Sequence, residues 1–341
     1  MNSRRGARIV VVGAGIGGLA AAARLAKDGF SVTVIERNDQ AGGRARLWKL
    51  AGYTFDMGPS WYLMPDAFER FFAHFGRQVS DYYKLRKLDP AYRVFFGPGQ
   101  SVDIPADRVG QRALFDRLEP GGGGKLDRYL DAAAYKYRVA VDEFLYRDYH
   151  SVFDFLNWRM MTEGLKLNVL GKLDAAVRRQ FSDRRARQIL EYGMVFLGTA
   201  PTAAPALYAL MSHVDLTQGV FYPMGGLATM ARGIQKLAEE QGVQVMLNTE
   251  AVRIVTERGR AVGVQARGAD GAAVSLPCDA VLANADYAHV ETELLTPADC
   301  SFPRRYWERR VVAPTLLLLY LGINRRLHGL LHHNLYFKPD W

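Results

Sequence analysis

The sequence predicts an α/β protein in which a Rossmann-like dinucleotide-binding domain carries a second domain of mixed sheet and helices. Three observations support this prediction. A glycine-rich turn between a strand and a helix opens the chain, a second glycine pair follows the next strand, and a helix, strand and hairpin block comes much later. With 341 residues the chain is long enough for about two domains and a large core.

The first unit begins with residues 9–12, consecutive branched apolar residues that are typical of a strand buried on both faces. Gly13, Gly15 and Gly18 then form the pattern G-x-G-x-x-G. The first glycine permits a tight turn, the second lets a pyrophosphate approach the backbone, and the third lets the helix pack closely on the strand. The alanine-rich run 19–27 predicts a helix, and the N-terminus of a helix suits a phosphate.

An acidic residue ends this unit at the expected place. Ala14 and Gly17 lie within the glycine turn, residues 31–35 predict the second strand, and Glu36 follows that strand directly. A carboxylate at this point accepts hydrogen bonds from a ribose 2′-hydroxyl and repels a 2′-phosphate, which argues against NADP. The alternative for Glu36 is a solvated charge at a strand end.

A second glycine pair lies in residues 37–46, RNDQAGGRAR. Its Gly43 and Arg44 can bring backbone N–H groups and a guanidinium to a diphosphate or to the edge of a flavin, although an ordinary basic surface loop would look the same. Just after the acid, the turn resembles the second signature of flavoproteins of the amine oxidase and phytoene desaturase superfamily. The resemblance favours FAD over NAD and implies that Arg37 also contacts FAD.

The resemblance becomes more specific in residues 55–65, FDMGPSWYLMP. This string is similar to the segment that follows the FAD fingerprint in bacterial phytoene desaturases, which usually have Thr where this chain has Ser60. It implies a GR2-type flavoprotein fold, with Gly58, Pro59 and Ser60 close to the isoalloxazine ring. Composition alone leaves two interpretations of this aromatic segment open, a core element or an apolar wall for a ligand.

The middle of the chain predicts a helical insert that covers a substrate tunnel. Residues 92–96 and 101–104 predict a hairpin, the four glycines 121–124 a flexible loop, and residues 126–147 and 184–197 amphipathic helices.

Two acidic residues of this insert, Asp148 and Asp154, lie among aromatic residues and are candidates for catalysis. A capped or salt-bridged helix end explains them better, so no catalytic residue is identified.

A later block, residues 222–286, repeats the pattern of helix and strand. Residues 227–241 predict a helix that ends at a glycine, and strands and a hairpin follow. The order resembles the same flavoprotein family. By this resemblance Val252 lies beside the adenine through its backbone, and the turn at Asn284 closes the cofactor domain.

The last part of the chain predicts a buried strand over residues 311–323, which are too few to span a bilayer. Residues 313–337 resemble the family's substrate-domain strand and the loop after it, so His328, His332 and His333 are loop residues rather than metal ligands. By the resemblance, relatives continue beyond the point that corresponds to Trp341, so we expect a C-terminally truncated chain.

Charge and cysteine content exclude other classes of function. The net charge is +9, but the basic residues are scattered in short clusters, with no zinc-finger spacing and no long basic helix, so we expect no nucleic acid partner. The two cysteines match no metal or redox motif. The glycine fingerprint occupies the apolar run that a signal peptide would need, so we expect a cytoplasmic protein.

The resemblance implies an FAD-dependent carotenoid desaturase of the phytoene desaturase type. Its substrate would be a long apolar polyene, which requires peripheral contact with a membrane. A related carotenoid isomerase or oxygenase, an amine oxidase-like flavoenzyme and an inactive fragment are the alternatives. The expected FAD-binding domain is discontinuous, residues 1–76 and 222–290, and residues 77–221 and 291–341 form the substrate domain.

Overall fold

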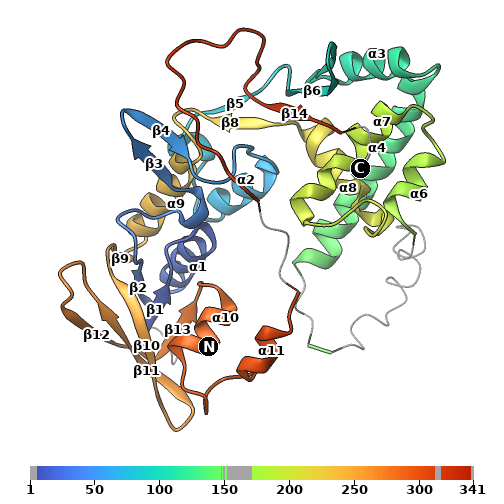
Figure 1. Ribbon diagram of the computed structural model, residues 1–341. Coiled ribbons are helices and arrows are strands. Elements are labelled where there is room, and N and C mark those ends of the chain that lie inside the picture. Colours follow the sequence, from blue (N-terminus) through green and yellow to red (C-terminus); the bar gives the residue numbers. More distant parts are fainter. Residues whose placement is uncertain (1–5, 147, 149, 152–170, 312–315, 339–341) are drawn as a thin grey trace.

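The computed structural model describes residues 6–146, 148, 150–151, 171–311 and 316–338. Two parts stand side by side in Figure 1. One, which we call the sheet half, contains β1 to β4, β9 to β13, α1, α2 and α9. The other, which we call the helical half, contains β6, β7, β14, α3, α4 and α6 to α8.

A four-stranded parallel sheet, in the order β13-β1-β2-β9, is the centre of the sheet half. Its strands are β1 (Arg8–Val12), β2 (Ser31–Ile35), β9 (Gln244–Met246) and β13 (Ala280–Ala283). Along β1, Ile9 and Val11 belong to one hydrophobic cluster, and Val10 and Val12 to another. Because successive side chains of a strand point to opposite faces, this run of four apolar residues shows that the sheet is covered on both sides.

Helices cover one face of this sheet and a second sheet covers the other. Helices α1 (Ile16–Lys27) and α9 (Ala228–Glu240) share a cluster with Ile9 and Val11 through Leu19 and Ile234. The antiparallel sheet on the other side consists of β10 (Glu250–Glu257), β11 (Arg260–Arg267) and β12 (Ala273–Pro277). The remaining elements of this region are β3 (Leu47–Leu50), β4 (Tyr53–Asp56), α2 (Pro65–His74), α10 (Tyr287–His289) and α11 (Arg304–Glu308). All the strands and helices expected for the dinucleotide unit are therefore present.

The helical half has its own core. Its helices are α3 (Arg108–Leu118), α4 (Gly122–Val139), α6 (Leu173–Arg178), α7 (Arg184–Glu191) and α8 (Leu210–Ser212). Phe115, Leu126, Phe181 and Ile189 are buried together between them. The sheet β14-β6-β7 packs on the same core, with β6 (Tyr92–Gly97), β7 (Gln100–Ile104) and β14 (Asn334–Tyr336). The predicted hairpin and both amphipathic helices are confirmed.

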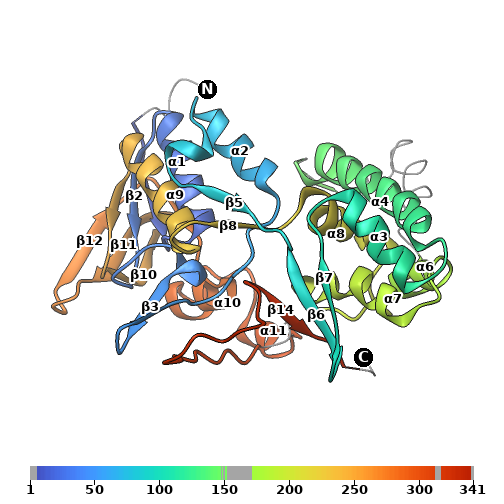
Figure 2. The same ribbon diagram turned by 90° about the horizontal axis from the view of Figure 1, so that it is seen from above.

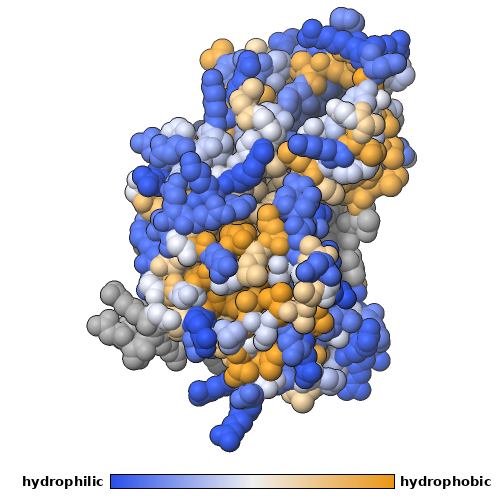
Figure 3. Space-filling view, turned by 90° about the vertical axis from the view of Figure 1, so that its left-hand side faces the viewer, coloured by the Kyte–Doolittle hydropathy of each residue, from blue (hydrophilic) through white to orange (hydrophobic). Residues whose placement is uncertain are grey.

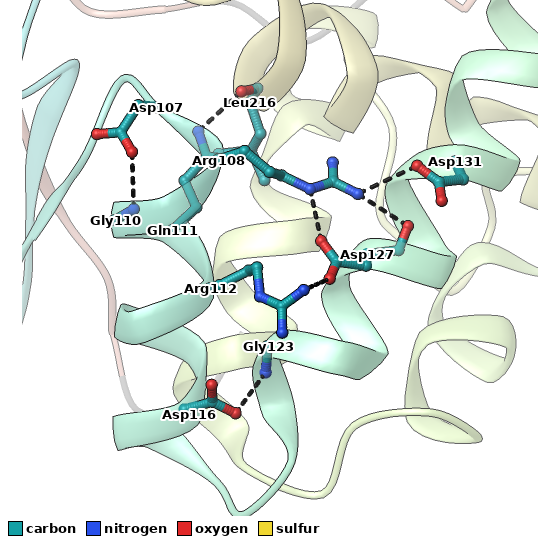
Figure 4. Close-up of polar contacts among 10 residues, drawn as sticks. All are labelled: Asp107, Arg108, Gly110, Gln111, Arg112, Asp116, Gly123, Asp127, Asp131 and Leu216. Carbon is teal, nitrogen blue, oxygen red and sulfur yellow. Dashed lines mark hydrogen bonds and ion pairs between the residues drawn. The ribbon is translucent and has the colours of Figure 1, made fainter.

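A carboxylate cluster fastens α3 to α4 (Figure 4). The Asp127 carboxylate accepts a hydrogen bond from Arg108 Nε at 2.7 Å and another from Arg112 Nη1. Arg108 also donates to Asp131 at 3.1 Å. Three ion pairs thus join two helices that are consecutive in the chain.

The four glycines at 121–124 are not a flexible loop, and that prediction was wrong. Gly121 takes a left-handed conformation (φ 71°), and α4 begins at Gly122. A Cβ on Gly122 would overlap the Phe115 carbonyl oxygen. Asp116 Oδ1 accepts a hydrogen bond from the Gly123 N–H at 2.9 Å (Figure 4). The glycines let the start of α4 approach the end of α3 more closely than any side chain would allow.

The two halves are joined by short strands. Figure 2 shows β5 (Leu85–Lys87) and β8 (Phe221–Pro223) running between them. These strands pair antiparallel, and a bridge from Tyr62 to Phe221 extends the junction. β14 pairs in parallel with β6, which brings a segment near the end of the chain to the same region.

The buried strand predicted over residues 311–323 is not present in its described part, residues 311 and 316–323. Leu317 and Leu319 are 87% and 72% exposed, and the segment has no regular structure. Tyr320 holds it through edge-on contact with Trp48 and a hydrogen bond to the Met57 carbonyl oxygen at 2.6 Å, and Gly322 packs against the Tyr53 ring. Among the described residues, no strand pairs with this segment, and an apolar strand without a partner cannot be buried.

Candidate dinucleotide site

The glycine turn lies at the carboxyl end of β1. Gly13 has φ +101°, a conformation that side chains rarely adopt, and its N–H donates to the Ile35 carbonyl oxygen at 2.8 Å. A Cβ on Gly18 would overlap the Gly13 carbonyl oxygen. The first and third glycines are therefore required by backbone geometry, as the sequence pattern predicts.

Asn284 is the residue that packs against this turn. It follows β13, and its N–H donates to the Val12 carbonyl oxygen at 2.9 Å. Its own carbonyl oxygen would lie 2.8 Å from a Cβ on Gly13, and its side chain would lie 3.2 Å from one on Gly17. Sequence reasoning placed a closing turn at Asn284 but did not find this contact. Its position directly after a parallel strand was the available signal, because the carboxyl ends of parallel strands meet at one edge of the sheet.

The start of α1 is open to an anion. Gly15 is the N-cap residue and offers no side-chain cap to the first turn. The first N–H groups of a helix have no partner within it, and they lie at the positive end of the helix dipole. The nearest atom to a Cβ on Gly15 would be the Asn284 amide nitrogen, 3.5 Å away. Packing within the protein therefore does not require a glycine at this position. This glycine leaves space in front of the helix, which is the space that a diphosphate would need.

Glu36 lies beside the turn and is almost fully buried. It is 6% exposed, and its Oε2 accepts a hydrogen bond from the Ala14 N–H at 2.9 Å. Its Oε1 accepts hydrogen bonds from the backbone N–H of Asn38, at 3.0 Å, and from the Asn38 side chain. A buried carboxylate needs such donors. They also fix its two oxygens at the edge of the glycine turn, where ribose hydroxyls are expected.

The second glycine pair packs on the first. The Gly42 N–H donates to the Ala14 carbonyl oxygen at 2.8 Å, and a Cβ on Gly43 would lie 3.2 Å from the Gly15 α-carbon. Both glycines have positive φ, 114° and 57°. Arg44 follows in the same turn with an exposed side chain, and Arg37 is exposed nearby in sequence. The structure thus unites the two signatures that the sequence separates by some 30 residues.

Gly58 extends this site toward the junction of the halves. A Cβ on Gly58 would overlap the Arg44 carbonyl oxygen, so residues 58–60 lie against the second glycine turn. Pro59 and Ser60 are exposed, and the Ser60 carbonyl oxygen is 2.9 Å from His333 Nε2.

Val252 lies in a bulge of β10. The register of β10 against β11 shifts between Ala251 and Arg253, which leaves Val252 without a pairing partner in β11. Its side chain is 47% exposed. A bulged residue has unpaired backbone groups, which is what a backbone contact to an adenine requires.

Sequence reasoning missed the role of Asp56. Its Oδ1 accepts a hydrogen bond from the Leu227 N–H at 2.9 Å, at the start of α9, and its carboxylate adjoins Gly226. Tyr222 OH is 3.5 Å from Asp56 Oδ2, and burial raises the pKa of this phenol. Asp56 is the second residue of the string 55–65, which resembles phytoene desaturases. This position was the available signal in the sequence that Asp56 belongs to the site.

The aromatic segment after residue 60 contributes to the core, and its second interpretation, an apolar wall for a ligand, stays a prediction. Tyr62 is a core residue, 2% exposed, and its hydroxyl is 2.9 Å from that of Tyr83. Trp61 is only partly buried and contacts Tyr192 and His333 at the junction. Of the two candidate acids, Asp148 is exposed, and Asp154 lies outside the described residues.

The turn, the acid and the open helix start define a dinucleotide-binding α/β protein, in which a second glycine turn packs on the first. The chain belongs to the flavin containing amine oxidoreductase family, whose model matches residues 16–321. FAD is therefore confirmed as the cofactor. The residues fit this group, because the cradle of glycines is free of side chains and Glu36 presents a fixed carboxylate beside it.

Curated relatives match along the whole chain. The chain is 40% identical to a carotenoid 3,4-desaturase of Haloarcula japonica, over 100% of this chain and 68% of that protein. It is 36% identical to a zeta-carotene-forming phytoene desaturase of Myxococcus xanthus (99% and 64%) and 34% identical to a 4,4'-diapolycopene oxygenase of Methylomonas (99% and 67%). The chain spans about two thirds of the length of these relatives.

Solved structures share the fold at low identity. An oxidoreductase from Methanosarcina mazei matches with a TM-score of 0.54 at 19% identity, over 84% of this chain and 61% of that one. Putrescine oxidase bound to putrescine matches with a TM-score of 0.53 at 20% identity, over 89% and 62%. These likenesses confirm the predicted α/β flavoprotein fold.

Proposed function

We propose that the chain acts as an FAD-dependent carotenoid desaturase, which introduces C=C bonds into a long polyene. One observation carries the proposal: a relative named carotenoid 3,4-desaturase is 40% identical along the whole chain. The glycine cradle, in which two turns pack on each other beside a buried acid, supports it from the structure.

The residues around the cradle would hold FAD at its diphosphate, its ribose, its adenine and its flavin ring. Gly13, Ala14, Gly15, Gly17 and Gly18 would bind the diphosphate through their backbone at the start of α1. Glu36 would accept hydrogen bonds from the ribose, and Val252 would contact the adenine through its backbone. Gly43, Arg44 and Arg37 would approach the diphosphate or the flavin edge, and Gly58, Pro59 and Ser60 would lie beside the ring.

The substrate has no acidic C–H bond, so two hydrogens must leave adjacent carbons in different forms. FAD supplies the acceptor for a hydride with its two electrons. The chain's own contribution is to orient the polyene, to exclude water, and to accept the remaining proton. Trp61, Tyr192 and Phe196 gather at the junction, where an apolar substrate would pass.

Peripheral contact with a membrane belongs to the same proposal, because the substrate dissolves in lipid. None of the helices among the described residues is long and apolar enough to cross a bilayer. Four arginines lie in α11 or directly after it, at positions 304, 305, 309 and 310, and Arg310 lies 4.1 Å above the Tyr306 ring. Figure 3 shows a second feature, hydrophobic residues gathered in the centre of one face with hydrophilic residues around them. Basic and aromatic residues together favour an anionic lipid surface.

Cofactor binding is tested first, by the absorption spectrum of the purified chain after FAD is added and free FAD is removed. We expect flavin absorption near ~450 nm to remain bound. Replacing Glu36 by Ala should weaken FAD affinity at least ~10-fold, because a charged hydrogen-bond partner is worth about 1.5–3 kcal/mol. Glu257→Ala, at the exposed end of β10, is the matched control and should bind normally.

Activity is tested with the FAD-loaded chain and phytoene in anionic liposomes, where conjugated products would absorb visible light. Hydrogen peroxide release with amines instead of polyene oxidation would contradict the proposal.

The membrane contact is tested by a double variant: Arg305→Glu with Arg309→Glu should reduce sedimentation with anionic vesicles. The exposed Arg179→Glu is its control, and equal loss in both would contradict the role of α11.

A further inference from the structure

We propose that His333 is the proton acceptor of the dehydrogenation, with its Nδ1 atom as the acceptor. This inference rests on the proposed function, since it assigns the proton that leaves the polyene. It comes from the junction of the two halves, where His333 meets the segment expected beside the flavin ring.

The position of His333 is fixed from both sides. Its carbonyl oxygen accepts a hydrogen bond from the Arg93 N–H of β6 at 3.0 Å, directly before β14 begins. Its ring nitrogen Nε2 is 2.9 Å from the Ser60 carbonyl oxygen. The backbone thus belongs to the helical half, and the side chain is bound to residue 60 of the sheet half. A residue held at both ends is placed precisely relative to residues 58–60.

The bond to Ser60 determines which nitrogen carries the proton. A carbonyl oxygen can only accept, so Nε2 must donate and carries the hydrogen. In a neutral imidazole the other nitrogen, Nδ1, then has a free lone pair. Nδ1 of His333 is buried and has no hydrogen-bond partner among the described residues. It is an acceptor without a donor on a side chain that is 7% exposed.

The surroundings keep the imidazole neutral. Burial is the main cause that lowers the pKa of His333 to about 4, the neighbouring His332 lowers it further, and the Ser60 hydrogen bond opposes them. The charged and titratable groups around it lie on β4, β6, β7 and β8 and on the neighbouring His332. Asp56 and Tyr222 adjoin His332, and Arg93 of β6 is paired with Asp103 by two hydrogen bonds of 2.5 and 2.8 Å. No carboxylate therefore holds a proton on His333 at neutral pH.

A weakly basic imidazole suits this reaction. When a hydride leaves one carbon of the polyene, positive charge develops there, and the C–H bond on the adjacent carbon becomes strongly acidic. The Nδ1 lone pair takes that proton, and the two electrons of the broken C–H bond form the new C=C bond. FAD, when bound, would supply the acceptor for the hydride and its two electrons. Trp61, whose ring is 4.9 Å from that of His333, gives the cation an aromatic neighbour.

The proton can then leave through the adjacent histidine. The rings of His332 and His333 are 4.5 Å apart, and His332 is exposed. His332 also packs on Tyr222, with ring centres 4.3 Å apart. This pair connects the buried nitrogen to solvent without opening the apolar side of the junction.

The test uses the FAD-loaded chain with phytoene in anionic liposomes, without oxygen, and follows the loss of flavin absorption. His333→Gln keeps an N–H that can donate to the Ser60 carbonyl oxygen but offers an amide that cannot take a proton. We expect the same FAD affinity and a rate of flavin reduction at least ~100-fold lower, the usual contribution of general base catalysis. His328→Gln, at an exposed position of the same loop, is the control and should react normally.

Two further readouts separate catalysis from a structural role. Added imidazole should partly restore flavin reduction in His333→Ala, because it can occupy the space of the lost ring. In the unsubstituted chain, nitrogen NMR should show His333 protonated at Nε2 and bare at Nδ1. A normal rate in His333→Gln, no rescue by imidazole, or a proton on Nδ1 would each overturn the assignment. If the unsubstituted chain reduces no flavin with any carotenoid, the proposed function fails instead, and this inference with it.

Discussion

Gly58 and Arg44 approach so closely that any side chain on the glycine would overlap the arginine's carbonyl oxygen. This contact joins the second glycine turn to the segment that continues toward the helical half. Neither residue is near the other in sequence, and both belong to strings that resemble flavoprotein signatures. The contact therefore makes two motifs parts of one surface.

Gly58→Ala should displace this surface while leaving the rest of the fold intact. Because the added methyl group meets backbone rather than a flexible side chain, the segment 57–60 must move. We expect loss of bound FAD upon desalting, measured as flavin absorption per chain. Ser60→Ala, which keeps the backbone and the carbonyl bond to His333, should retain FAD. Equal retention by both variants would show that the contact does not matter for the cofactor.

Two glycines of the first turn should behave differently when each is changed to alanine. Gly18→Ala forces a methyl group onto the Gly13 carbonyl oxygen, so we expect a loss of about 1–3 kcal/mol in the free energy of unfolding. Gly15→Ala has space in the protein and should leave that free energy almost unchanged, yet it should weaken FAD binding. Urea unfolding without FAD, followed by FAD titration, measures both. If Gly15→Ala binds FAD normally, the diphosphate does not lie in front of α1.

The start of α4 offers a second matched pair. Gly122→Ala would overlap the Phe115 carbonyl oxygen, whereas the nearest atom to a Cβ on Gly124 is 3.9 Å away. We expect Gly122→Ala to destabilise the chain by about 1–3 kcal/mol. Gly124→Ala should stabilise it by up to about 1 kcal/mol, through higher helix propensity. The order of the two unfolding midpoints is the measurement, and the reverse order would show that α3 and α4 are less closely packed.

Asp215 should make stability depend on pH. Burial raises its pKa from 3.8 to about 6, against the hydrogen bonds that it accepts from Tyr92 at 2.6 Å and Tyr192 at 2.8 Å. Between these two values the folded chain holds a proton that the unfolded chain has lost. The contribution of Asp215 to stability is therefore greatest below about pH 4 and falls by about 3 kcal/mol as the pH rises through about 6.

Asp215→Asn tests this dependence, since an amide keeps an acceptor for the tyrosines and cannot ionise. Unfolding at a series of pH values should show a flatter curve for the variant between about pH 4 and 6. Glu191, whose pKa burial raises to about 7, should still contribute a decline in the same direction. An unchanged curve in Asp215→Asn would mean that this carboxyl is not the group that titrates.

Local sequence patterns predicted the dinucleotide unit of the sheet half well, because the residues of each pattern are close together in the sequence. The strand before Gly13, the turn, the helix and Glu36 are contiguous, and period and spacing were enough to identify them. Asn284 and His333 were not found as site residues, because their partners are far away in sequence. Only the three-dimensional structure brings them to Gly13 and to Ser60.

The helical half was predicted less well for a related reason. A run of glycines is typical of a flexible loop, and no local pattern indicates that Gly122 faces a backbone carbonyl of the preceding helix. The strand expected at 311–323 is not formed in its described part, because a strand needs a neighbour as well as a pattern. The exact domain boundaries, 1–76 with 222–290 and 77–221 with 291–341, stay a prediction.

The contact of Asn284 with the first glycine turn also has a consequence for synthesis of the chain. The turn leaves the ribosome early, but the residue that packs behind it comes some 270 positions later. At roughly 5–20 residues per second, tens of seconds pass between the two events. Throughout that interval β1 lacks the neighbour β13 and leaves backbone N–H and C=O groups unpaired along one edge. The segment that will bind the cofactor therefore has an open strand edge until most of the chain has been made.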